Sequence, residues 1–267
     1  LYTNQAKTYL KMDIKILSQD KNKINFNVKE VDHVFLNTIR RLISEEVPTL
    51  AIDEINFIKN SSALYDEMLS LRLGLIPLKT DLKSYVLPEK AKNEKDPRAF
   101  LTLKLKVKGP KSVYASDLES QDPKVKPVYP EILIVKLLQN QNLELEATAI
   151  LGSGKKHMKF SPGLPYYHNI QKVVVKQKDT KEFKEKYPSQ IFDKNGLIDA
   201  KLINTPQLID ACKNINSEII EVKENEKEFI FYLELWGQLT AKEIFLEAVN
   251  TFNEKLDLFE KELKKIK

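Results

Sequence analysis

The feature that most constrains this fold is a regular apolar pattern at the C-terminal end of the chain. It begins at Thr240-Ala-Lys-Glu243, a capping box in which the Thr hydroxyl and the Glu carboxylate each satisfy a free backbone N–H. Apolar residues then recur at steps of mostly three or four residues: Ala241, Ile244, Phe245, Ala248, Val249, Phe252, Leu256, Phe259, Leu263 and Ile266. A helix over 240–266 is about 40 Å long. One compact domain cannot cover a stripe of that length, so a partner polypeptide is expected on part of it.

A second amphipathic helix is predicted near the N-terminus. Asp32 is a suitable N-cap and Pro48 marks the end of the helix. The apolar residues between them follow the 3.6-residue period: Phe35, Leu36, Ile39, Leu42 and Ile43. A single amphipathic helix is more often part of the chain's own core, but two such helices in distant parts of the sequence raise the case for a partner-binding face.

Strands flank this second helix. Residues 14–28 alternate on either side of a turn at 19–22, which predicts a β-hairpin. Residues 50–57 predict a strand whose alternation slips by one residue at Asp53-Glu54. The chain therefore opens with a strand–strand–helix–strand order.

The central region predicts one short helix and several strands. Leu64, Met68, Leu71 and Leu75 form one apolar helical face, closed by Gly74 and Pro77. Period-2 alternation or continuous apolar runs then predict strands over 101–107, 132–138, 143–150 and 229–235. The polar segment 80–97 is expected to be a loop. Residues 177–226 are rich in charged residues and Asn, with short helical patches around Phe183 and Leu208, and are expected to form a small satellite module.

The composition excludes several classes of protein. The apolar fraction is 42% and the charged fraction 30%, as in ordinary soluble globular proteins, and no apolar run approaches a membrane span. A single cysteine, Cys212, allows neither a disulfide framework nor a thiolate metal cage, and we expect it to be a small buried hydrophobe. Residues 1–11 lack the apolar segment of a secretory signal and are interpreted as an upstream extension or a cloning remnant. A cytoplasmic location is the default expectation.

The charge balance argues against a direct nucleic-acid binder. The formal net charge is +5, with 43 basic residues facing 38 acidic ones, so a mixed surface is expected in place of a basic stripe. Arginine stands at only four positions, two of them adjacent: Arg40, Arg41, Arg72 and Arg98. Arginine at these adjacent positions indicates sites that need a planar guanidinium with several N–H donors, which lysine cannot supply. The alternative is that arginine stands there through chance codon usage.

No catalytic pattern stands out. The acidic pairs Asp53-Glu54 and Asp66-Glu67 are isolated, whereas two-metal chemistry needs clustered carboxylates. Gly152-x-Gly154-Lys155-Lys156 departs from a phosphate-binding loop at two positions, because Ala149 and Lys156 replace the required residues. A glycine-rich turn with basic flanks is the preferred interpretation, and His157 is expected to be a structural hydrogen-bonding group.

Several sequence blocks together resemble one protein family. They are Asn37-Thr-Ile-Arg40-Arg41, Val47-Pro48, Ala51-Ile52-Asp53, Tyr65-Asp66-Glu67, Arg72-Leu73, Leu75-Ile76-Pro77 and the Gly152–Pro162 loop, with Gly237 before the closing helix. These blocks resemble the D-type subunit of archaeal DNA-directed RNA polymerase, whose family includes the eukaryotic third-largest-type subunits and the bacterial α N-terminal domain. None of the blocks would be specific alone.

The resemblance implies an α+β fold with a discontinuous organisation. Residues 12–58 and 227–267 would form a dimerisation domain, built from an antiparallel sheet and two helices. Residues 59–176 would form an inserted α/β domain that is mainly β, and residues 177–226 a degenerate ferredoxin-like module.

The resemblance also implies a non-catalytic assembly platform for transcription. The chain would form a heterodimer with subunit L and, with subunits N and P, seat the second-largest subunit, meeting DNA only through the complex and no membrane. The L interface would comprise Phe35, Ile39, Leu42, Ile244, Phe245, Val249, Phe252, Leu256 and Phe259. The contacts to the large subunits would comprise Arg40, Arg41, Gly152, Gly154, Lys155, His157 and Lys159.

The chain departs from the family at the iron–sulfur site that many of its archaeal members carry. Thr205, Leu208, Ala211 and Ile215 stand about where the cluster cysteines would lie, and one thiol, Cys212, cannot hold a cluster. No cofactor or metal is therefore expected. Two rival functions remain open: a Lys-rich protein that binds nucleic acid directly, and an enzyme acting on phosphorylated small molecules at the Gly152 loop.

Overall fold

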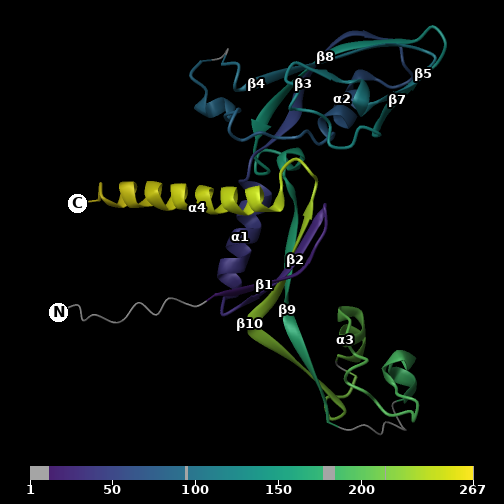
Figure 1. Cartoon of the computed structure of the whole chain (residues 1–267), viewed down its shortest axis with the longest axis vertical. Coiled ribbons are helices and arrows are strands. Elements are labelled where there is room, and N and C mark those ends of the chain that lie inside the picture. The colour runs from purple at the N-terminus through teal and green to yellow at the C-terminus, as the bar shows by residue number, and fades with distance from the viewer. Residues whose placement is uncertain (1–11, 94–95, 177–183, 214, 267) are drawn as a thin grey trace. The chain divides into compact units, whose positions relative to one another are not determined.

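The computed structural model (Figure 1) describes residues 12–93, 96–176, 184–213 and 215–266. These residues divide into two compact units. The first unit comprises the described residues of segments 1–17, 26–33 and 167–231; the second comprises those of 18–25, 34–166 and 232–267. The helices are α1 (His33–Glu45), α2 (Asp66–Gly74), α3 (Pro206–Cys212) and α4 (Ala241–Leu263). The strands are β1 (Asp13–Gln19), β2 (Lys23–Lys29), β3 (Thr49–Asn60), β4 (Phe100–Lys108), β5 (Lys111–Tyr114), β6 (Glu119–Ser120), β7 (Leu133–Leu137), β8 (Asn142–Gly152), β9 (Gly163–Val175) and β10 (Ile220–Leu235). The fold is α+β, as predicted.

One four-stranded sheet has the order β1-β2-β10-β9. The predicted hairpin is confirmed, since β1 and β2 are neighbours joined through residues 20–22. Strand β9 was not predicted from the sequence: residues 163–176 were placed in the inserted domain without a strand, whereas β9 is hydrogen-bonded to β10. β10 is also longer than its predicted core of 229–235 and begins in the region assigned to the small module.

A second sheet, of order β3-β8-β4-β6, forms the framework of the inserted region. β3 and β8 are antiparallel, and their register shifts between Ile52 and Glu54. The predicted slip at Asp53-Glu54 is therefore a β-bulge. One face of this sheet holds a core built from buried aliphatic side chains such as Leu103 and Leu145. The opposite face is polar, with cross-strand Lys–Glu pairs between β4 and β8.

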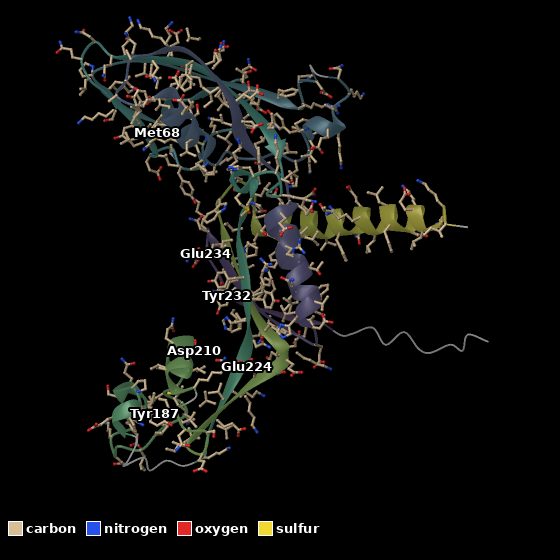
Figure 2. The ribbon with its side chains drawn as sticks, turned by 180° about the vertical axis from the view of Figure 1, so that it is seen from behind. Met68, Tyr187, Asp210, Glu224, Tyr232 and Glu234 are labelled. Carbon is tan, nitrogen blue, oxygen red and sulfur yellow. The ribbon has the colours of Figure 1, made fainter. Side chains whose placement is uncertain are left out.

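The buried face of α2 differs from the prediction. The sequence pattern grouped Leu64, Met68, Leu71 and Leu75, but Leu69 and Leu73 are the helical residues that enter the core. Met68, which Figure 2 labels, is exposed together with Leu71 and Leu75. Both sets satisfy a helical period, and only the position of the sheet beneath the helix decides between them.

The small module has an apolar core of its own. Its buried residues are Tyr187, Ile191, Ile198, Ile203, Cys212, Ile219 and Ile220. The predicted burial of Cys212 is confirmed, and the predicted helical patch around Leu208 is α3. The patch around Phe183 lies outside the described residues. Figure 2 labels Tyr187 and Asp210 in this module.

The two long amphipathic helices are confirmed as α1 and α4. The capping box of α4 is formed as predicted: the Glu243 N–H donates to Thr240 Oγ1 at 3.3 Å, and the Thr240 N–H donates to Glu243 Oε2 at 2.8 Å. No described helix combines the length and apolar composition that a bilayer span requires.

Candidate functional site

The apolar stripe of α4 has two environments along its length. Ala241, Ile244 and Ala248, in the first two turns, are buried in the chain's own core. Phe245 and Phe252 are half-buried. From Val249 onward the remaining members of the stripe are exposed: Val249, Leu256, Phe259, Leu263 and Ile266. Figure 1 shows this second half of α4 extending past α1. An apolar face of this kind is typical of a helix that packs on a partner.

Helix α1 presents a smaller apolar face beside α4. Leu36, Leu42 and Ile43 are buried, whereas Phe35 is exposed and Ile39 half-buried. Two members of the predicted L interface, Leu42 and Ile244, thus serve the chain's own core.

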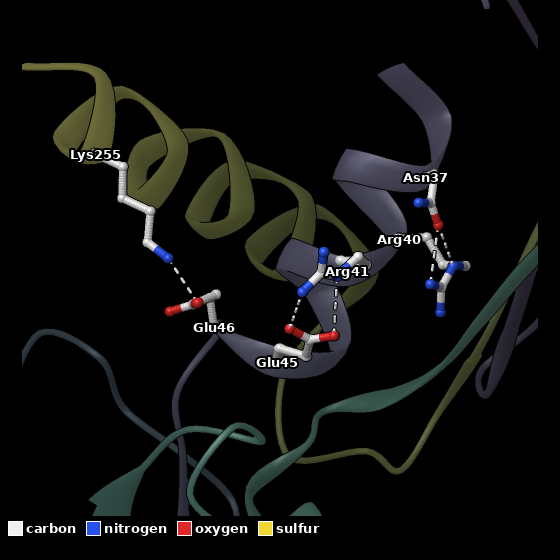
Figure 3. Close-up of polar contacts among 6 residues, drawn as sticks. All are labelled: Asn37, Arg40, Arg41, Glu45, Glu46 and Lys255. Atoms are coloured by element: carbon white, nitrogen blue, oxygen red, sulfur yellow. Dashed lines mark hydrogen bonds and ion pairs between the residues drawn. The ribbon is translucent and has the colours of Figure 1, made fainter. Parts of the chain in front are cut away.

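The C-terminal end of α1 is tied to the middle of α4. Lys255 Nζ of α4 lies 2.6 Å from Glu46 Oε1, as Figure 3 shows. A groove of about 260 Å³ runs between the two helices, lined by side chains that include Thr38, Leu42 and Phe252. The ion pair and the groove mark where the two helices lie side by side, with the exposed part of the α4 stripe beyond them.

The two adjacent arginines of α1 bind acceptors on their own helix (Figure 3). Arg40 donates from Nε and Nη2 to Asn37 Oδ1, at 3.1 and 2.9 Å. Arg41 forms a two-point contact with Glu45, at 3.2 and 3.1 Å. The hydrogen bond from Arg41 holds the pKa of Glu45 below its usual range, against a smaller opposing effect of burial. Each guanidinium group uses two N–H donors of its planar fork, Nε and Nη2. The Arg41 side chain is 60% exposed.

The Gly152–Pro162 loop packs against the C-terminal end of α1. A Cβ on Gly154 would collide with the carbonyl oxygen of Ser44, so only glycine permits this approach. The Lys155 N–H donates to the Glu45 carbonyl at 2.8 Å. A Cβ on Gly152 would lie 2.8 Å from the ring of Phe160, which is fully buried. Gly152 and Gly154 are therefore required for packing within the chain.

His157 and the lysines of the loop divide into two groups. The His157 ring accepts a hydrogen bond at Nδ1 from the Lys159 N–H at 3.1 Å, which confirms the structural role predicted for it. Lys155 and His157 are exposed, whereas the Lys159 side chain is only 14% exposed. Among the residues predicted to contact large subunits, Arg41, Lys155 and His157 thus offer the most accessible side chains.

Asp53 is a residue whose role was missed in the sequence. It was treated as half of an isolated acidic pair, yet its Oδ1 lies 2.7 Å from Lys159 Nζ and its Oδ2 3.2 Å from Lys156 Nζ. Burial acts to raise the pKa of Asp53, but the hydrogen bonds and charges of the two lysines outweigh it and hold the pKa below its usual range. The β-bulge was the one signal in the sequence that could have drawn attention to this position.

No metal centre is evident in the part of the chain that the structure describes. None of those residues form a group of three or more His, Cys, Asp or Glu side chains placed to hold an ion. The three histidines lie in different elements or loops.

Comparison with known proteins identifies the family. Residues 54–163 match the model of the RNA polymerase Rpb3/RpoA insert domain. The DNA-directed RNA polymerase subunit Rpo3 of Methanosphaera stadtmanae is 36% identical over 262 residues, which cover 92% of this chain and 96% of that protein. This chain belongs to the Rpo3 family. The family resemblance inferred from the Asn37–Arg41 and Gly152–Pro162 blocks is therefore confirmed.

Two further Rpo3 proteins support the assignment over nearly the whole chain. The protein of Thermococcus kodakarensis is 36% identical over 268 residues, covering 96% of this chain and 99% of its own length. That of Halobacterium salinarum is 34% identical over 252 residues, covering 93% and 96%. The Rpo3 relationship therefore includes α1, α4 and the region between them.

Proposed function

We propose that this chain is a non-catalytic assembly subunit of DNA-directed RNA polymerase, and that α1 and the exposed half of α4 bind a small subunit of the L type. The observation that carries the proposal is the change along α4 from buried to exposed apolar residues. Leu256, Phe259 and Ile266 are 49%, 62% and 74% exposed, although they continue the stripe whose first members are buried. A helix from a partner that packs along α4 would cover them.

The exposed apolar side chains off the stripe distinguish the binding face from the rest of the helix. Leu246 and Leu258 are 54% and 59% exposed. At 100° per residue they lie far around the helix from the stripe centred on Phe252, whereas Leu256 and Phe259 lie close to it. The proposed interface is thus a defined face, and an obligate interface of this type buries above about 2,000 Å² in total.

The proposed architecture is the discontinuous one of the family. The dimerisation domain would combine the β1–β2 hairpin, α1, β10 and α4, with the β3-β8-β4-β6 sheet as the inserted domain. The assignment of β9 needs adjustment, because it pairs with β10 and thus joins the sheet of the dimerisation domain.

The large subunits and subunits N and P would bind elsewhere on the same chain. Arg40, Arg41, Lys155 and His157 remain the candidates for contacts with the large subunits, because Arg41, Lys155 and His157 are exposed and Arg40 keeps a guanidinium fork at the surface of α1. Gly152, Gly154 and Lys159 would act indirectly, by shaping the loop that presents Lys155 and His157.

We also propose that the small module holds no iron–sulfur cluster. Cys212 is fully buried among isoleucine side chains, and burial raises the pKa of its thiol, which disfavours the thiolate that a metal needs. Anaerobic purification followed by iron and sulfide analysis should find no stoichiometric cluster; about four irons per chain would contradict the proposal.

Direct binding of nucleic acid has less support. Lys104 and Lys106, on the exposed face of the inserted sheet, lie 2.7 and 2.8 Å from Glu146 and Glu144. These two positive charges are thus paired with carboxylates of the neighbouring strand. The isolated chain should bind DNA weakly, with a shallow dependence on salt; tight binding that weakens steeply with salt would favour this rival. A nucleotide-induced rise in melting temperature would favour the small-molecule enzyme instead.

A pair of leucine substitutions tests the main proposal. Leu256→Asp places a charge in the proposed seam and should reduce co-purification with the L-type subunit at least 100-fold. Leu258→Asp changes an exposed leucine outside the stripe and should leave co-purification unchanged. Equal behaviour of the two variants would show that α4 does not bind its partner through this face.

A further inference from the structure

The C-terminal end of α1, the bulge of β3 and the loop after β8 meet at one point. The chain passes from α1 to β3 through residues 46–48 alone, and Figure 3 shows this end of α1 with Glu45 and Glu46. With this single connection, β3 and its sheet could still bend relative to α1. The loop after β8 supplies the second contact, through the Lys155 N–H and the Glu45 carbonyl.

The second contact is supported by a partly buried polar cluster. Lys159 Nζ donates to the Ile52 carbonyl at 2.9 Å and to Asp53 Oδ1 at 2.7 Å. The same ammonium group lies 5.0 Å from the centroid of the Phe160 ring, and that of Lys156 lies 5.7 Å from it. An ammonium group that is largely removed from water in this way needs its partners, so loss of one partner destabilises the arrangement strongly.

The backbone of the loop is held just as closely. Thr49 Oγ1, at the start of β3, donates to the Phe160 carbonyl at 2.7 Å in a buried site. Gly154 lies against the Ser44 carbonyl, where no side chain fits. The loop is thus attached both to β3 and to the last turn of α1.

We propose that Asp53, Gly154 and Lys159 are positioning residues that lock the inserted sheet onto the end of α1, so that both move as one body during assembly. This inference rests on the proposed function for its biological meaning: the partner face of α1 and α4 would stand at a set orientation to the inserted domain when the large subunits arrive. Preorganisation of this kind raises affinity without adding a contact.

Distance measurements on the full chain test the lock without any partner. Spin labels at Val34→Cys and Asn56→Cys report on α1 and β3, two exposed positions, while the native Cys212 is buried. The labelled chain with Asp53, Gly154 and Lys159 unchanged should give a narrow distance distribution. Lys159→Met and Gly154→Val should at least double its width, and Lys159→Arg, which keeps the cation, should largely preserve it. Lys136→Met, an exposed lysine on β7, is the control and should change nothing.

A nearly isosteric variant guards against simple unfolding. Asp53→Asn keeps the size of the side chain and removes its charge, so it should widen the distribution while the circular dichroism spectrum stays that of the folded chain. Distributions as narrow as the wild type in Lys159→Met, Gly154→Val and Asp53→Asn would overturn the inference.

Assembly measurements separate the lock from the proposed function. The Asp53→Asn chain should bind the L-type subunit with unchanged affinity, and the resulting heterodimer should bind the second-largest subunit at least tenfold more weakly. Failure of the wild-type chain to bind the L-type subunit would contradict the proposed function but leave the distance result valid. A wider distribution with unchanged binding of the second-largest subunit would overturn the coupling to assembly.

Discussion

The two halves of α4 carry the same apolar pattern and have different fates. In the first half, Ile244 and Ala248 are fully buried against the rest of the chain. In the second half, Leu256 and Phe259 belong to the same apolar stripe and are exposed. A helical period therefore identifies an apolar face that must be buried, but not whether the same chain or a partner buries it. Substitutions in each half test this difference.

The largest expected effect is on the buried half. Ile244→Ala should lower the free energy of unfolding by about 2–5 kcal/mol, because it removes buried methyl groups and leaves a cavity. Urea denaturation of the isolated chain measures this. Leu246→Ala, an exposed position two residues away, should change the value by less than about 0.5 kcal/mol. Similar losses in both variants would mean that the first half of α4 is not distinguished by packing.

A substitution in the exposed half should have little effect on the isolated chain. Phe259→Ala removes a large aromatic side chain, yet we expect a change below about 0.5 kcal/mol in urea denaturation, since the ring packs on little of its own chain. In the complex with the L-type subunit the same change should weaken binding by at least tenfold. A loss of stability in the isolated chain as large as that of Ile244→Ala would erase the contrast between the halves.

The N-terminal cap of α4 should contribute at an intermediate level. Thr240→Ala removes the hydroxyl that accepts the Glu243 N–H, which costs about 1 kcal/mol at typical caps. Thermal unfolding should show a lower melting temperature. Thr240→Ser keeps the hydroxyl and serves as the control; if it destabilised the chain as much as alanine does, the cap would not be the cause.

The ion pair at the boundary between the halves should contribute little to stability. Lys255 and Glu46 have side chains that are 48% and 21% exposed, so solvent weakens their attraction. Lys255→Met should lower the free energy of unfolding by no more than about 1 kcal/mol, and by less at high salt. A loss that does not depend on salt would assign the role of Lys255 to the packing of its methylene groups.

Local patterns in the sequence predicted much of the fold. The hairpin, α1, α4 with its cap and the bulge in β3 each depend on residues within a few positions of one another, so periodicity and cap chemistry are sufficient to find them. The family motifs added the identity, because residue types at fixed spacings survive when the surrounding sequence changes.

The errors share one physical cause, which is dependence on residues far away in the sequence. α2 has two apolar sets, and the sheet below it selects Leu69 and Leu73 over Met68 and Leu71. Asp53 looked like surface until the chain brought Lys159, more than a hundred positions later, within 2.7 Å. β9 was missed because its alternation is mixed with polar residues and its pairing partner, β10, is distant in sequence.

Residue patterns alone were enough to predict which segments are helices, which carry an apolar stripe and which family the motifs resemble. These properties follow from short-range geometry and from residue types at fixed spacings. Three features could be seen only in the folded chain: where the α4 stripe stops being core, which face of α2 is buried, and why Gly154 and Lys159 are needed. Each of these features depends on which surfaces pack together. Burial follows from that packing and not from the pattern of any one segment.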